Sequence, residues 1–351
     1  MTTNNRVAVE PLIAFGTTVY KKLGVSDEEA HLISDSLVQA DLWGHQSHGV
    51  MRLPWYAARI ESGVMQAVTK PKTLVDAGAI TLIDGQDGIG QTLAQFAVKD
   101  AVERARKHGV GVVSIRNSNH FGTAMYHTRL AAQKGCIGFL TTNGSPAIAP
   151  WGGRKKLFGN NPLSFSAPAG KHGHVILDIA NTKVARGKIY LARQRGEPIP
   201  EGWALTPEGA PTTDAALGAE GVILPVGDHK GYGITYMMDV LSGVLSGSQF
   251  CDGVFGPYQA EKKGGTGQLM LALNIEAFRP LSEFEEDMEE MISKTKAIPL
   301  AHGFDECYFP GELEQRNNKE NRKNGIALPE NTLGDLRKLA NHMSLQNYLP
   351  F

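Results

Sequence analysis

Apolar and polar positions along this chain follow two different periods, and the change of period divides the chain into three parts. In the first part, Ile33, Leu37 and Ala40 recur at steps of three or four residues, which predicts an amphipathic helix. Ser26 and Glu29 have the spacing of a capping box at the start of that helix. The N-terminal part is therefore expected to be helical.

After residue 75 the pattern changes to short, β-branched apolar runs that alternate with longer helical stretches. The predicted strands are 80–85 (ending in a turn), 110–115, 136–142, 163–167, 175–180 and 269–275. The predicted helices are 91–108, 123–134, 230–245, 281–296 and, near the end of the chain, 333–343. The stretch 181–229 is polar and rich in proline, which predicts turns.

No flexible linker separates these parts. The pattern predicts an α/β (α+β) fold in which residues 1–75 and about 300–351 together form one discontinuous helical domain. Residues 76–299 form the α/β region.

Charge and cysteine usage exclude several classes. The 35 Lys and Arg residues balance 36 Asp and Glu residues without a long basic run, which argues against nucleic acid or an anionic membrane as the main partner. The three cysteines are far apart and form no CxxC pair, so neither a disulfide framework nor a thiolate metal site is expected. Residues 1–5 do not begin a signal peptide, and no apolar run is long enough for a membrane helix, so a cytoplasmic protein is expected.

The first candidate for chemistry is the segment Asp41–Arg52. If the helix continued, Asp41, His45, His48 and Arg52 would lie within about 60° of one another around its axis, although Gly44 and Gly49 argue against an unbroken helix. An arginine can grip a carboxylate with two hydrogen bonds, and a histidine can exchange a proton near neutral pH. The alternative is a solvated helix end. A metal site at His45 and His48 lacks a third ligand at a suitable spacing.

The second candidate, Arg116–Gly122, follows a predicted strand and precedes a helix, where functional groups often lie on an α/β scaffold. His120 can act there as an acid or base, or the Asn and Ser residues around it can simply cap the helix. Asp178, after another strand, can orient a histidine or a ribose, or cap a turn.

Glycine is unusually frequent, at 40 of 351 residues, yet the sequence contains neither GxGxxG nor a P-loop. The usual dinucleotide fingerprint is therefore absent. Lys230 and Gly231 open an apolar helix whose first amide groups can hold a phosphate, or they are only a glycine-rich helix entry.

Taken together, these motifs resemble the type 2 malate/L-lactate dehydrogenase family. The matching stretches are SHGVMRLPWY (47–56), NSNHFGTAMYHTRLAA (117–132), NGSPAIAPWGG (143–153), FGNNPLSFSAP (158–168), LDIANT (177–182), GAPTTD (209–214), HKGYGITYMMDVLSGVLSG (229–247) and FPGE (309–312). The family comprises non-Rossmann oxidoreductases of 2-hydroxy acids that use NAD or NADP, including ureidoglycolate and sulfolactate dehydrogenases. The resemblance implies a homodimer that binds a small carboxylate substrate, with cofactor and substrate bound in residues 76–299.

The resemblance also implies roles for individual residues. Substrate is expected at Ser47, Arg52, Asn143 and Ser145, and the acid or base is His120 or His48, with Asp178 as a further catalytic residue. The cofactor is expected at the following positions: Gly144, Asp178, Ile179, Ala180, Lys230, Gly231, Gly311 and Glu312. No metal is expected. In the ureidoglycolate enzyme of this family, an arginine before the GQL string contacts the cofactor. Here Gly264, Gly265 and Thr266 precede Gly267-Gln268-Leu269 and no arginine is present, which leaves both NAD and NADP open.

Two other functions remain open at this point. The same fold can support an NADPH-dependent reductase of a cyclic imine carboxylate or a diketo sugar acid. A ligand-binding protein without turnover is a third possibility, against which the two histidines and Arg52 argue, because binding alone does not need two groups that titrate near neutral pH.

Overall fold

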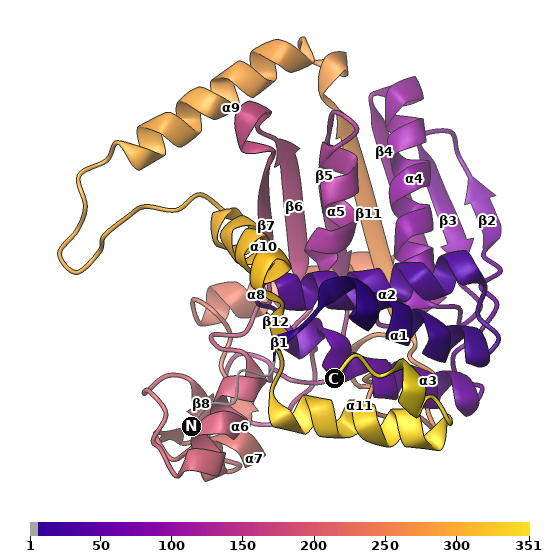
Figure 1. Ribbon diagram of the computed structural model, residues 1–351. Coiled ribbons are helices and arrows are strands. Elements are labelled where there is room, and N and C mark those ends of the chain that lie inside the picture. Colours follow the sequence, from indigo (N-terminus) through magenta and orange to yellow (C-terminus); the bar gives the residue numbers. More distant parts are fainter. Residues whose placement is uncertain (1–5) are drawn as a thin grey trace.

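A seven-stranded mixed sheet lies at the centre of the computed structural model, which describes residues 6–351 (Figure 1). Its order is β2-β3-β4-β11-β5-β6-β7; β3 and β4 are parallel and the other neighbours are antiparallel. The strands are β2 (Lys72–Asp76), β3 (Ile80–Asp84), β4 (Val110–Ser118), β5 (Cys136–Thr142), β6 (Leu163–Pro168), β7 (His174–Ile179) and β11 (Thr266–Asn274). This mainly antiparallel order confirms an α/β fold that is not the doubly wound Rossmann type.

Helices cover both faces of this sheet. Helices α4 (Gly90–His108) and α5 (Ala124–Ala132) pack on one face, and α8 (His229–Asp239) with the π-turn Val240–Val244 packs on the other. Alternate residues of one strand serve the two faces, as period-two geometry requires. On β5, Leu140 joins the core under α4 and α5, whereas Phe139 joins the core under α8.

The two ends of the chain share a third core. It contains apolar residues of α1 (Val9–Lys22), α2 (Asp27–Leu42) and α3 (Leu53–Glu61) together with α11 (Glu330–His342). The short strands β1 (Arg6–Val7) and β12 (Ile326–Ala327) pair beside it. The predicted capping box is present, since Ser26 Oγ accepts the Glu29 amide at 3.3 Å. The shared core supports the division into a discontinuous helical domain, which remains a proposal. The signal-peptide prediction concerns residues 1–5, which lie outside the described residues.

The stretch 181–229 contains more regular structure than predicted. It forms α6 (Arg186–Arg195), β8 (Ala204–Leu205), β9 (Pro211–Thr212), α7 (Ala215–Glu220) and β10 (Val222–Ile223), which enclose a small core of their own. Strands of two residues are too short to show a period, so the pattern could not reveal them. Helix α10 (Glu312–Asn324) was also missed, because it is polar on nearly every side.

Helix α9 (Leu281–Lys296) has the predicted bounds and extends away from the sheet, and the chain after it makes a wide excursion before returning at α10 (Figure 1). None of the helices in residues 6–351 is both long and apolar enough to span a membrane.

Candidate active site

The segment after α2 does not continue as a helix. Gly44 adopts a φ of 89°, and the chain then makes two 3-10 turns, Gln46–His48 and Val50–Arg52. A side chain at Gly49 would place its Cβ 2.0 Å from the Asp41 carboxylate, so only glycine lets the loop close over that group. The loop thereby holds His48 and Arg52 above the end of α2.

Asp41 of α2 is buried under this loop and is hydrogen-bonded to its backbone. Its side chain is 2% exposed and accepts the backbone amide of Val50 at 2.8 Å. Burial raises the pKa of the Asp41 carboxyl group from its usual value to about 8, because a charge there would be poorly solvated. The carboxyl group is therefore mostly protonated at neutral pH.

Asp41→Asn is expected to change how stability depends on pH. An unfolded chain releases the Asp41 proton at about pH 4, whereas the folded protein keeps it up to about pH 8. The folded state binds more protons in that interval, so the wild type loses stability as pH rises through it. Asparagine is always neutral and still accepts the Val50 amide. Thermal unfolding across this pH range should show the stability of the wild type falling relative to Asp41→Asn; a constant difference would refute the buried, protonated carboxyl.

His48 and His120 lie against each other, although they come from distant parts of the sequence. His120 follows β4, and its ring lies 5.6 Å from the His48 ring, with 23° between the planes. Burial and the nearby Arg52 charge lower the pKa of His48 to about 3 and also lower the pKa of His120 well below its usual range. Both imidazoles are therefore neutral at physiological pH, which permits the stacked arrangement.

The hydrogen bonds of His120 define its tautomer. The Gly122 backbone amide donates to His120 Nδ1 at 3.1 Å, and the Tyr56 hydroxyl lies 2.6 Å from the same atom. Because a backbone N–H can only donate, Nδ1 must be the acceptor, and the proton of the neutral ring is assigned to Nε2. His120 therefore offers an N–H donor, rather than a lone pair, at its remaining nitrogen.

His48 has no such constraint. Its Nδ1 lies 2.9 Å from the Ser47 hydroxyl, which can either donate or accept. If Ser47 accepts, the proton is on Nδ1 and the Nε2 lone pair is free. Arg52 is fixed beside it, since its Nε donates to the Ser47 carbonyl at 2.7 Å and its guanidinium lies 4.6 Å from the centre of the Trp55 ring. The structure thus brings together the predicted residues Ser47, His48, Arg52 and His120.

Tyr56 and Arg59 support this group and were not foreseen as site residues. Tyr56 is 1% exposed, and Arg59 is 2% exposed. Arg59 donates to Asn119 Oδ1 at 2.9 Å and to the Gln259 carbonyl at 2.6 Å. The first of these bonds fixes Asn119, the residue that precedes His120. Arg52, Tyr56 and Arg59 are spaced by four and three residues, the spacing of one helix face, and this was the signal in the sequence that could have found them.

Asp178 lies near the end of β7, and its carboxylate reaches the beginning of α5. This carboxylate accepts the Met125 amide at 2.8 Å, so it caps the N-terminus of that helix. One of the alternatives left open by the sequence, a hydrogen bond between Asp178 and a histidine, is not formed in the described residues. Ile179 at the end of the same strand is 38% exposed. Two buried polar atoms nearby in sequence, Thr123 Oγ1 and Asn181 Oδ1, have no hydrogen-bond partner in the described chain. Such atoms fit a polar ligand such as a dinucleotide.

Asn143 acts inside the protein. Its amide donates to Asp239 Oδ1 and to the Gln249 carbonyl, both at 2.8 Å, and its Oδ1 accepts the Gly267 amide at 2.9 Å. These bonds leave the Asn143 side chain little capacity for substrate. The next residue, Gly144, donates its amide to Asn161 Oδ1 at 3.0 Å. Ser145 is half-buried in the same loop. Contact of these residues with substrate or cofactor stays a prediction.

The remaining predicted cofactor residues fall into two groups. Lys230 is exposed on α8, and a Cβ at Gly231 would lie 2.0 Å from the Val226 carbonyl, so close packing explains that glycine. Gly311 caps α10 with a φ of 89°. Glu312 is held by Lys296 and Arg316, each at 2.6 Å. Their contact with a cofactor stays a prediction.

His45 also has a partner from α10. Its Nε2 lies 3.2 Å from Glu314 Oε1, which links the end of α2 to that helix. Among residues 6–351, His, Cys, Asp and Glu side chains form no group of three or more that could hold a metal ion.

Comparison with known proteins gives one consistent result. The malate/L-lactate dehydrogenase family model matches residues 7–337. A malate dehydrogenase of Pyrococcus abyssi is 37% identical, over 97% of this chain and 96% of the relative. An L-sulfolactate dehydrogenase of Methanocaldococcus jannaschii is 38% identical, over 93% of this chain and 94% of the relative. The solved structure of the sulfolactate dehydrogenase from that organism superimposes with a TM-score of 0.92 at 36% identity, covering 97% of this chain and 98% of that chain.

The chain therefore belongs to the malate/L-lactate dehydrogenase family. It is an oxidoreductase that transfers a hydride between a small 2-hydroxy acid and NAD or NADP. This confirms the function and the cofactor class that the sequence motifs predicted.

Proposed function

We propose that the substrate is a 2-hydroxy acid with a second acidic group, such as malate or sulfolactate, and that the group of His48, Arg52 and His120 carries the reaction. The observation that carries this proposal is the pair of neutral histidines stacked beside a fixed arginine. The similar enzymes named for malate and sulfolactate support the choice of substrate.

Each of the three side chains has a distinct task in this proposal. The Arg52 guanidinium binds the carboxylate next to the reacting carbon with paired hydrogen bonds. His48 Nε2 accepts the hydroxyl proton of the substrate, and His120 donates its Nε2–H to the same substrate oxygen. When NAD or NADP is bound, its nicotinamide ring takes up the hydride that leaves the reacting carbon.

Substrate binding itself prepares His48 for this task. The Arg52 charge is one of the causes that lower the pKa of His48 in the free protein. A substrate carboxylate neutralises that charge and so raises the pKa of His48 toward the value that a general base needs. Proton acceptance is thus linked to the presence of the acid group on the substrate.

The experiment that tests this proposal measures NADH and NADPH absorbance with a panel of substrates. Turnover should be highest with malate or sulfolactate, lower with lactate and ureidoglycolate, and absent with an alcohol that has no carboxylate. Preference for a cyclic imine carboxylate would overturn the assignment of a 2-hydroxy acid as substrate. It would not affect the proposed role of Arg52, because that substrate also has a carboxylate for Arg52 to bind. Equal turnover of the simple alcohol would overturn the role of Arg52.

We also propose that the protein is a homodimer in the cytoplasm. Apolar side chains are exposed on and after α8: Met237, Val244, Leu245 and Phe250. Four exposed apolar side chains within fourteen residues favour a subunit contact on this side of the protein. A sedimentation measurement that gives the mass of a single chain would refute the homodimer. Cys136, Cys251 and Cys307 are all free thiols, which supports a reducing compartment.

A further inference from the structure

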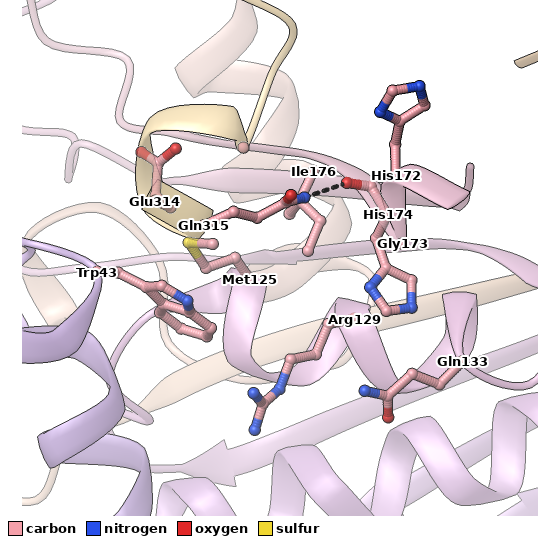
Figure 2. A pocket seen from close by; sticks show the side chains of 11 residues that line it. Trp43, Met125, Arg129, Gln133, His172, Gly173, His174, Ile176, Glu314 and Gln315 are labelled. Atoms are coloured by element: carbon pink, nitrogen blue, oxygen red, sulfur yellow. Dashed lines mark hydrogen bonds between the residues drawn. The ribbon is translucent and has the colours of Figure 1, made fainter. Parts of the chain in front are cut away.

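The substrate that we propose has a second acidic group, and none of the three side chains with assigned tasks binds it. Arg52 takes the first carboxylate, and the two histidines take the hydroxyl group. Another positive charge, that of Arg129, lies in the cavity of about 190 Å³ between α5, β7 and α10 (Figure 2). No residue that lines this cavity belongs to the group of His48, Arg52 and His120. The surroundings of Arg52 itself are therefore the place for the second acidic group.

Tyr258 is the unassigned polar side chain in these surroundings. The Arg52 guanidinium lies 4.6 Å from the centre of the Trp55 ring, and the Tyr258 ring lies 6.2 Å from the same ring at an angle of 75°. Burial lowers the pKa of Arg52, and Tyr56 and Tyr258 partly oppose that lowering, which places both phenol groups near the guanidinium. Tyr258 thus belongs to the wall of the site.

The loop 254–265, which carries Tyr258, is held in place by α3. Arg59 Nη1 donates to the Gln259 carbonyl at 2.6 Å, and the Gly256 amide donates to Gln259 Oε1 at 3.0 Å. A Cβ at Gly256 would lie 2.5 Å from Tyr258 Cε1, so the ring can lie there only because residue 256 is glycine. The loop therefore fixes the position of the Tyr258 ring.

The hydroxyl group of Tyr258 is available for a ligand. It has no hydrogen-bond partner within residues 6–351, and the residue is 53% exposed. The Ser145 hydroxyl lies on the same glycine, since a Cβ at Gly256 would be 3.0 Å from Ser145 Oγ, and it too has no partner in the described part of the chain. Two free hydroxyl groups near an arginine can donate hydrogen bonds to an acidic group.

We infer that the Tyr258 hydroxyl donates a hydrogen bond to the second acidic group of the substrate, with the Ser145 hydroxyl beside it, and that Tyr258 is thereby a specificity-determining residue. The inference rests on the proposed function for the class of substrate. The two acidic groups are then bound by different side chains, the first by the Arg52 fork and the second by the tyrosine. A hydroxyl group donates to a carboxylate and to a sulfonate alike, so both malate and sulfolactate fit this arrangement.

The test compares malate and sulfolactate, which have the second acidic group, with lactate, which lacks it, in the wild type and in Tyr258→Phe. Loss of a hydrogen bond to a charged group weakens binding roughly tenfold or more. KM for malate or sulfolactate should rise by about that factor with little change in kcat, whereas the constants for lactate should stay as in the wild type. Because the substrates are compared in the same variant, a general effect on folding or on cofactor binding cancels in the ratio of their kcat/KM values.

An unchanged ratio would overturn the inference, whether Tyr258→Phe acts on all substrates as the wild type does or slows all of them alike. Gly256→Ala keeps the hydroxyl group but displaces the ring, and it should lower the same ratio. The matched control is Tyr348→Phe, because Tyr348 is 57% exposed, has no hydrogen-bond partner for its hydroxyl group in the described residues and lies in the 3-10 turn Gln346–Tyr348 near the C-terminus. This control should leave the ratio unchanged.

The wild type alone separates this inference from the proposed function. If the wild type shows no preference for malate or sulfolactate over lactate, the proposed substrate class is wrong, and the role of Tyr258 falls with it. If the wild type has that preference and Tyr258→Phe keeps it, only the role of Tyr258 is overturned.

Discussion

His48→Gln is expected to lower kcat about 10²- to 10⁴-fold, the usual contribution of a positioned general base. Glutamine is close to histidine in length and can form hydrogen bonds, but its amide cannot take up a proton. The Gly122 amide occupies Nδ1 of His120 and leaves its Nε2 protonated, whereas the Ser47 hydroxyl allows His48 the tautomer with a free Nε2 lone pair, so His120 does not replace His48 as the proton acceptor. Turnover in both directions, measured at saturating cofactor, checks the effect.

The matched control is the same substitution at the neighbouring histidine. In His120→Gln the amide N–H can take the place of the Nε2–H donor, so this variant should keep much more of its turnover than His48→Gln. Unchanged cofactor binding and thermal stability in both variants would confine the difference to the chemical step. If His120→Gln is the more damaged enzyme, the two roles have to be exchanged.

Arg52→Ala is expected to lower kcat/KM roughly 10- to 100-fold, because a charged hydrogen bond to a carboxylate contributes about 1.5–3 kcal/mol. Arg52→Lys should be intermediate, since lysine keeps the charge but loses the fork and the bond from Arg52 Nε to the Ser47 carbonyl. The control is Arg193→Ala, an exposed arginine on α6.

A second prediction concerns how the activity of Arg52→Ala depends on pH. Arg52 is one cause of the low pKa of His48, so its removal raises that pKa. The profile of kcat/KM for alcohol oxidation should therefore show a loss of activity at acidic pH that sets in at a higher pH than in the wild type, since a protonated His48 cannot accept a proton. A normal kcat/KM for Arg52→Ala would contradict the role of the arginine.

Several helices and strands could be predicted from the sequence, because the residue patterns that indicate them lie within the element itself. Strand β5 and helix α9 have the predicted bounds, since a mainly apolar run and an amphipathic period each extend over several residues. The loop that carries His48 and Arg52 was suspected from Gly44 and Gly49. Its geometry depends on Asp41 beneath it, a contact across nine residues that no local pattern encodes.

The tautomer of His120 could not be predicted from the sequence either, because it depends on contacts between residues that are distant in the chain. It depends on a hydroxyl from Tyr56, 64 residues earlier in the chain, and on the conformation that turns the Gly122 amide back toward the ring. Sequence motifs therefore found both histidines but left their roles open. Asn143 shows the same limit: a motif predicted contact with substrate, which stays a prediction, but not the hydrogen bonds by which its side-chain amide connects Asp239, Gln249 and Gly267.

Nitrogen-15 NMR of the imidazole groups tests the central claim most directly, because the shift of each ring nitrogen reports whether it carries a proton. With histidine labelled, and His120→Gln used to assign the signals, the account predicts that in the free enzyme at neutral pH the Nδ1 atom of His120 is unprotonated and its Nε2 carries the proton. A proton on Nδ1 of His120 would contradict the account, since that ring could then accept the substrate proton itself.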